Sequence, residues 1–295
     1  MEPTNHLTLE PALKGETVSQ GASASTIKTI LLHIQNDRTL EARLQAALSL
    51  ARAAEAHLRC LHVTPIEAYV TMDGFGGLFV MDKLMAQVDQ EEEKLRSALE
   101  RRLTAEDVTW DYQQVTANTV SEVVRCAALS DIVITGRQAH VGREQSLEIS
   151  ILGDVLMAVR TPLLIPGDNQ ASFDPFGPAV IAWNGSYEAA NAVRNAIALL
   201  KLSSDVHVIR FCSGDEAPPT VLLEYLSRQG IHAQLETWVQ DDETVPELLV
   251  EYAQAKAASY VVMGGYGHNR AGEFLFGGVT RTLLKACPVA LALAH

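Results

Sequence analysis

A repeat of one α/β pattern is the feature that most constrains what this chain can fold into. Residues 130–136 form a short apolar segment that ends on glycine, and a segment of the same kind recurs at residues 258–264. A proline-led apolar segment follows in each half, at residues 162–165 and 288–291. Self-similarity of this kind predicts two copies of one domain.

Each half alternates β-branched segments with helical segments, an order typical of parallel α/β sheets. We therefore predict two tandem Rossmann-like, doubly wound domains, each with a mainly parallel five-stranded sheet. In the first half, strands are predicted near residues 27–34, 58–63, 108–115, 131–135 and 162–165, and helices near 39–56, 82–103, 118–129 and 152–160. In the second half, strands are predicted near 178–183, 205–211, 231–239, 260–264 and 288–293, and helices near 186–201, 217–229, 244–257 and 279–286.

The length of 295 residues fits two domains of ordinary size. Prolines and turn residues interrupt both helix and strand between the halves. The predicted division is a disordered tail over residues 1–26, a first domain over 27–166, a linker over 167–177 and a second domain over 178–295.

Charge and hydropathy exclude two classes of partner. With 23 basic and 36 acidic residues and a formal net charge of -13, the chain would repel a nucleic-acid backbone. It has no apolar run long enough to span a bilayer and no signal-peptide pattern at its start, which predicts a cytoplasmic protein without a membrane partner. Four widely spaced cysteines without a C-x-x-C pair predict reduced core thiols.

One segment has no counterpart in the second half. The first half is longer, and the excess lies at residues 64–83, where Gly74, Gly76 and Gly77 stand among large apolar residues. Two interpretations stay open for this insertion. It is a surface loop or subunit contact, or it is a flexible lid over a ligand.

The carboxyl ends of the second half's strands are the expected ligand position, because open parallel sheets bind ligands there. This rule points to Asn184, to Phe211 and to the turn that follows Met263. The turn is rich in glycine, which lets backbone amides approach an anion closely, and the helix after it directs its positive dipole end toward that anion.

Gly264, Gly267 and Gly277 give the spacing Gly-x2-Gly-x9-Gly directly after a predicted strand and before a helix. This arrangement resembles the ATP-binding signature of the universal stress protein family, which includes tandem two-domain members. The resemblance covers residues 27–166 and 178–294 and is most specific at 259–290. It implies a stress-response protein that binds ATP or another adenine nucleotide in its second half, without metal or catalytic residues and with at most weak ATP hydrolysis.

The resemblance also implies which residues hold the nucleotide. In nucleotide-binding members of the family, an aspartate after the first strand lies near the adenosine, and a Ser or Thr after the last glycine contacts phosphate. This chain has Asn184 and Gly278 at those positions, so one contact loses its charge and the other keeps only a backbone amide. Thr280 matches the family's helix-start threonine. The expected set is Ala182, Asn184, Phe211, Met263, Gly264, Tyr266, Gly267, Gly277, Gly278, Val279 and Thr280.

The first half departs further from this pattern. Ala139 replaces the second glycine, and Gly153 follows Gly136 by 17 positions where the second half has 13. Asp154 would then occupy the helix start that faces phosphate, where its charge opposes an anion. We therefore predict that the first half has a degenerate site.

Other polar residues have two interpretations each. His33 and His62 lie near the ends of neighbouring predicted strands and form a candidate zinc site with Asp37, or they are hydrogen-bonded structural histidines. His268 in the glycine-rich turn either meets phosphate or is a solvated loop residue, and Arg270 in the same turn is placed to neutralise phosphate charge.

Two further functions stay open beside nucleotide binding. One is a small-molecule binder or enzyme that reuses the fold, since fold does not determine function. The other is an assembly or regulatory module without a ligand. For assembly, the resemblance implies that residues 289–294 pair with the first half's last strand as an internal pseudo-dimer, and a homodimer of two chains is the further alternative.

Overall fold

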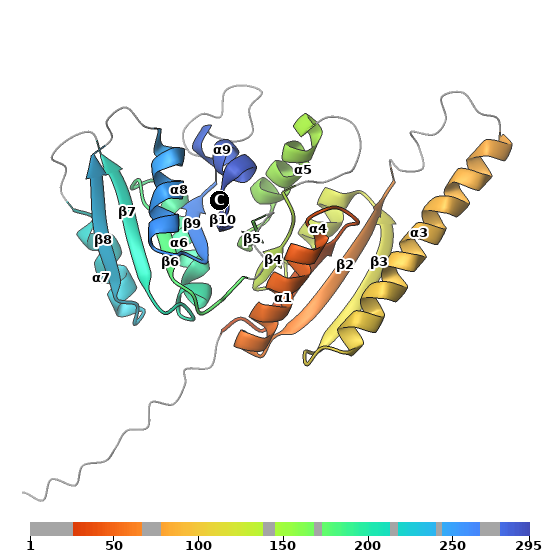
Figure 1. Ribbon diagram of the computed structural model, residues 1–295, viewed down its shortest axis with the longest axis horizontal. Helices are drawn as coiled ribbons and strands as arrows, with labels where there is room; N and C mark the ends of the chain where they lie inside the picture. The colour runs from red at the N-terminus through yellow and green to blue at the C-terminus, as the bar shows by residue number, and fades with distance from the viewer. Residues whose placement is uncertain are drawn as a thin grey trace, which may run out of the picture.

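The computed structural model describes residues 26–66, 78–137, 145–167, 173–212, 218–239, 244–265 and 278–295 (Figure 1). In the first half the elements are β1 (Thr29–Ile34), α1 (Leu40–Ala54), β2 (His57–Pro65), α3 (Leu78–Thr104), β3 (Trp110–Ala117), α4 (Thr119–Ala127), β4 (Ile132–Ile134), α5 (Gln145–Ala158) and β5 (Leu163–Ile165). In the second half they are β6 (Ala179–Ala182), α6 (Tyr187–Leu200), β7 (Val206–Cys212), α7 (Thr220–Arg228), β8 (Ala233–Val239), α8 (Val245–Ala255), β9 (Tyr260–Gly264), α9 (Gly278–Ala286) and β10 (Ala290–Ala294).

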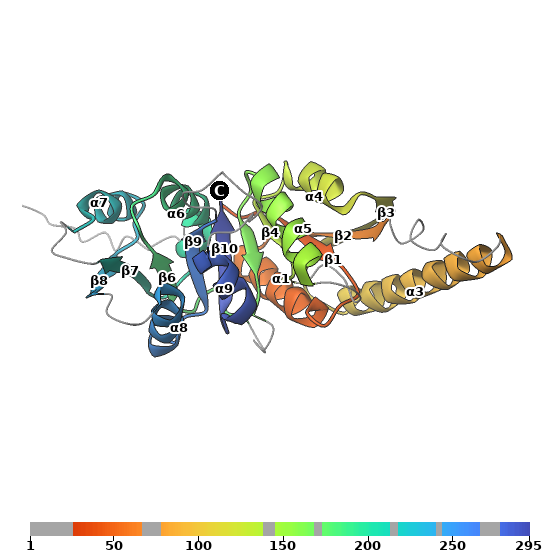
Figure 2. The same cartoon turned by 90° about the horizontal axis from the view of Figure 1, so that it is seen from above.

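The ten strands form one sheet in the order β3-β2-β1-β4-β5-β10-β9-β6-β7-β8. Each half contributes five strands in the same spatial order, so the predicted doubly wound α/β class is confirmed. The prediction of two five-stranded sheets needs one correction, because β5 and β10 join them into a single sheet. Figures 1 and 2 show these two strands between the halves.

Among the described strands, the antiparallel pair lies at the junction between the halves. Leu163, Leu164 and Ile165 pair with Leu293, Ala292 and Leu291, whereas the neighbouring strands within each half are parallel. The predicted pairing of residues 289–294 with the first half's last strand is therefore confirmed. Pairing also removes two exposed strand edges that would otherwise invite association with other chains.

Two apolar layers cover the two faces of the sheet. One lies under α1, α3, α6 and α7 and includes Leu48 and Leu226, and the other lies under α4, α5, α8 and α9 and includes Leu156 and Leu249. Strands buried on both faces explain the continuous apolar segments of the sequence. Each fully buried leucine of this kind contributes about 1.5–3 kcal/mol relative to an exposed one.

The two halves differ most in the connection after β2. Part of the insertion, residues 67–77, lies outside the described residues. Residues 64–66 end β2 and the turn after it, and residues 78–83 open α3, which begins at Leu78 where a helix was predicted near residue 82. Figure 2 shows this helix extending beyond β3 at one end of the molecule. The choice between a loop and a lid stays a prediction.

The helix before β5 begins earlier than its predicted start near residue 152. α5 runs from Gln145 to Ala158, so Gly153 and Asp154 lie in its interior. The prediction treated Gly153 as the counterpart of Gly277 and therefore as the end of a turn. That alignment is wrong, because α5 continues through Gly153. A glycine inside a helix costs only about 1 kcal/mol and does not by itself interrupt one.

Three of the four cysteines lie in described surroundings. Cys60, Cys126 and Cys287 are buried free thiols, in agreement with the prediction. Burial raises the pKa of Cys60 to about 12, so this thiol is protonated and unreactive near neutral pH. Within the described residues, no helix combines the length and hydrophobicity needed to cross a bilayer.

Candidate functional site

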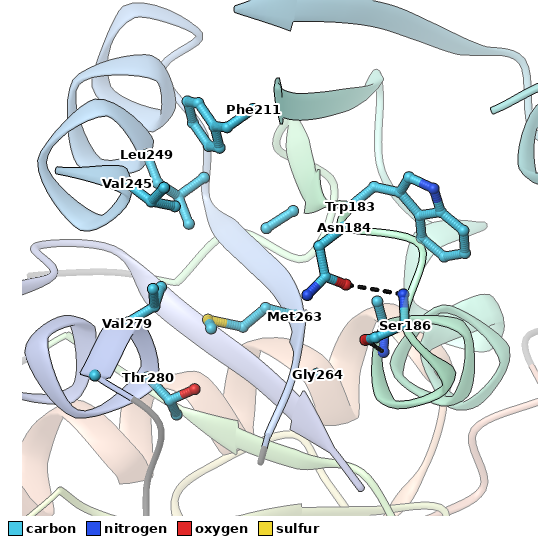
Figure 3. Close-up of a pocket in the computed structure, with 13 residues that line it drawn as sticks. Trp183, Asn184, Ser186, Phe211, Val245, Leu249, Met263, Gly264, Val279 and Thr280 are labelled. Atoms are coloured by element: carbon cyan, nitrogen blue, oxygen red, sulfur yellow. Dashed lines mark hydrogen bonds between the residues drawn. The ribbon is translucent and has the colours of Figure 1, made fainter. Parts of the chain in front are cut away.

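A cavity of about 250 Å³ opens at the carboxyl ends of β6, β7 and β9 (Figure 3). The starts of α6, α8 and α9 complete its walls. Eight of the predicted site residues line it together: Ala182, Asn184, Phe211, Met263, Gly264, Gly278, Val279 and Thr280. Tyr266, Gly267 and Gly277 lie outside the described residues.

Five further residues line the cavity without having been predicted. They are Trp183, Ser186, Ala189, Val245 and Leu249. Trp183 and Ser186 flank the predicted Asn184, so the turn that contains Asn184 was the signal that pointed to them. Val245 and Leu249 come from α8, and the rule that ligands bind at the carboxyl ends of strands does not point to residues of a helix.

Asn184 holds one orientation at the rim of the cavity. Its side-chain oxygen Oδ1 accepts a hydrogen bond of 3.0 Å from the backbone N–H of Ser186. Because only the oxygen of an amide accepts, the amide nitrogen is turned toward the cavity, as Figure 3 shows. Asn184 therefore offers a ligand a hydrogen-bond donor without a charge.

The start of α6 is set by its own cap and by a glycine beneath it. The side chain of Ser186 accepts a hydrogen bond of 3.1 Å from the backbone N–H of Ala189. A Cβ on Gly264 would lie 2.6 Å from the carbonyl carbon of Glu188 and 2.7 Å from the nitrogen of Ala189. Glycine is required at the end of β9 because the helix backbone approaches it so closely.

An apolar wall lies opposite Asn184. Phe211, Val245 and Leu249 face the cavity from β7 and α8 (Figure 3). The Trp238 ring packs edge-on against Phe211, with centroids 6.4 Å apart, and Trp238 packs in the same way against Tyr252 at 5.3 Å. Edge-to-face pairs of this kind hold ring positions firmly, so this wall is preorganised for a flat apolar group.

The third side of the cavity is the N-terminus of α9. The helix begins at Gly278, and the Thr280 hydroxyl lies in its first turn with only 4% of the residue exposed. No charged side chain is among the described residues that line the cavity. Among the described residues, the positive contribution on this side is that of the helix start, which suits an anionic group.

The universal stress protein family model matches residues 175–295, which include every element that forms this cavity. The second half is a universal stress protein domain. A sequence search of curated proteins found no match to the chain.

Solved structures extend the likeness to both halves. A universal stress protein from Archaeoglobus fulgidus is 15% identical, with 90% of this chain and 97% of that chain covered and a TM-score of 0.69. A functionally unknown protein from Pseudomonas aeruginosa is also 15% identical, with 92% and 93% covered and a TM-score of 0.52. At such identities the comparison shows a shared fold. The first half therefore has the universal stress protein fold as well.

The first half builds the corresponding turn with a different polar group. Asp37 stands two residues before the helix cap Thr39, as Asn184 stands two before Ser186, and its Oδ1 accepts the Thr39 N–H at 2.6 Å. Arg43 on α1 donates to both Asp37 oxygens at 3.0 and 2.9 Å and to the Gln35 carbonyl at 2.8 Å. The Asp37 and Arg43 side chains are each only 1% exposed. The carboxylate is thus fully engaged within the protein.

One predicted reason for a degenerate first-half site is wrong, and the other concerns a residue outside the described part of the chain. Asp154 is exposed in the interior of α5 and does not stand at a helix start, so it cannot oppose an anion there. Ala139 is outside the described residues. The ion pair of Asp37 with Arg43 is what the structure shows at this turn, and the degenerate site stays a prediction.

The two histidines of the candidate zinc site point to opposite faces of the sheet. His62 accepts or donates a 2.8 Å hydrogen bond at Nδ1 with the Tyr112 hydroxyl and pairs at Nε2 with Glu92 of α3. His33 lies on the other face, where its Nδ1 is 3.4 Å from the Thr135 hydroxyl. Because neighbouring residues of a strand alternate between faces, the two rings do not converge. Both are hydrogen-bonded structural histidines.

Proposed function

We propose that the second half binds an adenine nucleotide, with ATP as the first candidate, and that the protein acts in a stress response through this binding. The observation that carries the proposal is the cavity at the carboxyl ends of β6, β7 and β9. It combines an aromatic and aliphatic wall, one oriented amide and a helix N-terminus. Sites for small organic ligands have this composition, with few polar groups in a mostly apolar cleft.

The three sides of the cavity fit three parts of a nucleotide. The wall around Phe211 and Leu249 suits the flat face of the base. The Asn184 amide suits an acceptor on the base or the ribose. The first turn of α9, with its backbone amides and the Thr280 hydroxyl, suits the phosphates. The site proposed is the predicted set from Ala182 to Thr280, extended by Val245 and Leu249.

Only one nucleotide is expected per chain. The first half, for which we propose the boundaries 27–166, keeps a carboxylate at the corresponding turn but binds it to Arg43. The described residues around the cavity include no pair of groups for general acid and base catalysis. We propose that the protein is a binder rather than a hydrolase and that it is located in the cytoplasm.

Gly278 gives a clean test of the phosphate side. A Cβ at this position would meet no heavy atom within 4 Å, so a side chain fits without disturbing the fold. Gly278→Glu places a carboxylate at the start of α9, where it stabilises the helix but repels phosphate. We expect ATP affinity to fall at least about tenfold in Gly278→Glu, because repulsion near a protein surface easily reaches the 1.4 kcal/mol that this represents. Gly278→Ala, the matched control, should bind as the wild type does.

The measurement is isothermal titration calorimetry with ATP and adenosine, supported by thermal melting. Ligand at about 100 times its Kd stabilises the native state by roughly 2.7 kcal/mol and raises Tm. Adenosine lacks phosphate, so its affinity should be the same in all three proteins. Absence of any ATP heat or Tm shift in the wild type would reject the proposal, and equal ATP affinity in Gly278→Glu would move the phosphates away from α9.

A ligand-free assembly module is the second candidate function. The antiparallel pairing of β5 with β10 favours it, because this contact already gives the chain the form of a dimer. Mass measurement in solution by light scattering tests whether two chains associate further. A homodimer that forms in the absence of ATP and persists when ATP is added would favour assembly as the main role.

A further inference from the structure

The residue that follows Gly264 is held between the two halves of the molecule. Gly265 is buried, and its N–H donates a 2.9 Å hydrogen bond to the carbonyl of Ala294 on β10. A Cβ on Gly265 would lie 2.4 Å from Cδ2 and 3.3 Å from Cγ of Leu156. Leu156 belongs to α5 of the first half and is fully buried. The end of β9 is thus fixed by its own half through the backbone and by the other half through side-chain packing.

This contact is one residue away from the cavity. Gly264 lines the cavity and supports the start of α6, whereas Leu156 is not among the lining residues. One planar peptide group joins Gly264 and Gly265. The side chain that packs on Gly265 is therefore one residue away from the cavity wall and does not itself touch the cavity.

The first half makes a related contact in the opposite direction. Arg137 follows Gly136 as Gly265 follows Gly264, and its guanidinium Nη2 donates a 3.1 Å hydrogen bond to the carbonyl of Val289, just before β10. We call Gly264, which ends β9, and Gly136, which lies two residues after β4, the strand-end glycines. In both halves the residue after this glycine touches the other half. The contact at Gly265 differs in that it lies beside a cavity.

We infer that Leu156 is a positioning residue for the second-half cavity, so that the first half sets the ligand affinity of the second. This inference rests on the proposed function for its ligand and on the geometry at Gly265 for its mechanism. Truncation of Leu156 leaves Gly265 without its packing partner, and the end of β9 then samples positions that do not fit the ligand. A smaller fraction of the protein then has the binding-competent arrangement, and the apparent ligand affinity falls with that fraction.

A reciprocal pair of substitutions tests the contact. Leu156→Ala should weaken ATP binding about three- to tenfold, because the competent arrangement becomes one of several. Gly265→Ala should weaken it as well, since its methyl group enters the space of Leu156. In the double variant the new methyl group occupies the vacated space, so ATP affinity should lie closer to the wild type than in either single variant. Met157→Ala, on the exposed side of the same helix, is the matched control.

Hydrogen exchange in the ligand-free proteins provides a readout that does not depend on ATP. Amides of residues 260–265 should exchange faster in Leu156→Ala than in Met157→Ala, and the double variant should regain protection. Leu156→Val, which keeps most of the side chain, serves where Leu156→Ala does not fold. Unchanged exchange in a folded Leu156 variant overturns the inference, whatever ATP does.

The two proposals fail in different ways. If the wild type does not bind ATP but exchange at 260–265 responds to Leu156, the nucleotide is wrong and the positioning contact stands. If the wild type binds ATP with the same Kd as folded Leu156→Ala, the inference is overturned and the proposed function stands. Strictly additive losses in the double variant also overturn it, because two residues that act through one contact are not additive.

Discussion

The turn after β1 and the turn after β6 have the same place in the fold but differ in what their polar side chain does. We call the first a closed corner, because Asp37 is bound within the protein, and the second an open corner, because Asn184 lines a cavity. Both turns place a polar side chain two residues before a helix cap, and both end against a strand-end glycine. In the first half that side chain is the carboxylate of Asp37, which Arg43 neutralises. In the second half it is Asn184, and Ala190 stands at the position of Arg43, four residues after the cap. The polar side chain of this turn therefore carries no charge, and a cavity lies beside it.

The physical reason lies in the cost of burying charge. A carboxylate that is 1% exposed needs a cation and further hydrogen bonds close by. Arg43 provides both. Burial lowers the pKa of its guanidinium, and the Asp37 charge opposes that shift. An amide such as Asn184 meets its needs with one backbone N–H and keeps its other group for solvent or ligand. A turn geometry that both halves share and a free ligand site are therefore separate properties.

Removal of Arg43 should break the closed corner and gives the largest expected effect. Arg43→Ala leaves the Asp37 charge buried without its partner, which typically costs about 3–5 kcal/mol. The measurement is urea-induced unfolding followed by circular dichroism at pH 7.5. Arg194→Ala, an exposed arginine of α6, is the control and should change stability by less than about 0.5 kcal/mol.

A double variant separates the loss of charge pairing from the loss of packing. Arg43→Met with Asp37→Asn makes the first-half turn resemble the second, because no buried charge remains. It should be clearly more stable than Arg43→Ala. If Arg43→Ala is as stable as the Arg194→Ala control, the ion pair is not what closes the first-half corner, and the comparison fails.

The two strand-end glycines should respond unequally to a methyl group. Gly264→Ala would drive its Cβ into backbone atoms of α6 at 2.6 and 2.7 Å, and backbone cannot move aside cheaply. Gly136→Ala would meet the Arg43 guanidinium at 2.2 Å and the Thr39 hydroxyl at 2.8 Å, which are side-chain ends. Overpacking costs about 1–3 kcal/mol, and we expect Gly264→Ala near the upper end and Gly136→Ala near the lower.

Thermal melting of the two variants measures this difference. In an Arg43→Ala background the nearest obstacle to Gly136→Ala is gone, so the added cost should fall. The Gly264→Ala cost should be the same in either background, because it lies in the other half. A Gly136→Ala variant that loses more stability than Gly264→Ala would reverse the order of rigidity proposed for the two corners.

Most of the described second-half site can be predicted from the sequence because its signals are local. The rule that ligands lie at strand carboxyl ends, together with the family's glycine spacing, was enough to bring Asn184, Met263 and Thr280 into one set. Val245 and Leu249 were missed because an amphipathic helix shows which face is buried but not what that face meets. Long-range packing of α8 against β7 decides that.

The first-half corner shows the converse. The sequence indicates Asp37 as a candidate metal ligand and gives no signal for Arg43, because an arginine within a helix pattern usually belongs to the solvated face. Only the path of the turn brings the guanidinium back over Gly136. The glycine spacing that located the second-half turn also misled in the first half, where Gly153 is an ordinary helix residue. Spacing is informative only when the strand and helix around it are correct.

A smaller difference between the halves concerns their buried histidines and the pH dependence of stability. His62 of the first half has Tyr112 and Glu92 as partners, whereas His207 of the second half packs edge-on against Tyr252, with ring centroids 6.5 Å apart. Burial lowers the pKa of His207, and the positive charge of Lys256 lowers it further against the opposing effect of Asp205 and Glu236.

His207 should therefore make the protein less stable as the pH falls below the ordinary histidine pKa of about 6.5. Below that pH the unfolded chain binds a proton that the native state resists, so the free energy of unfolding decreases until the pH reaches the lowered native pKa. His207→Gln should flatten this part of the profile in urea unfolding at pH 7.5, 6.5 and 5.5, whereas His232→Gln, an exposed histidine of the same half, should leave it unchanged. Equal profiles for wild type and His207→Gln would show that the packing against Tyr252 does not hold this histidine neutral.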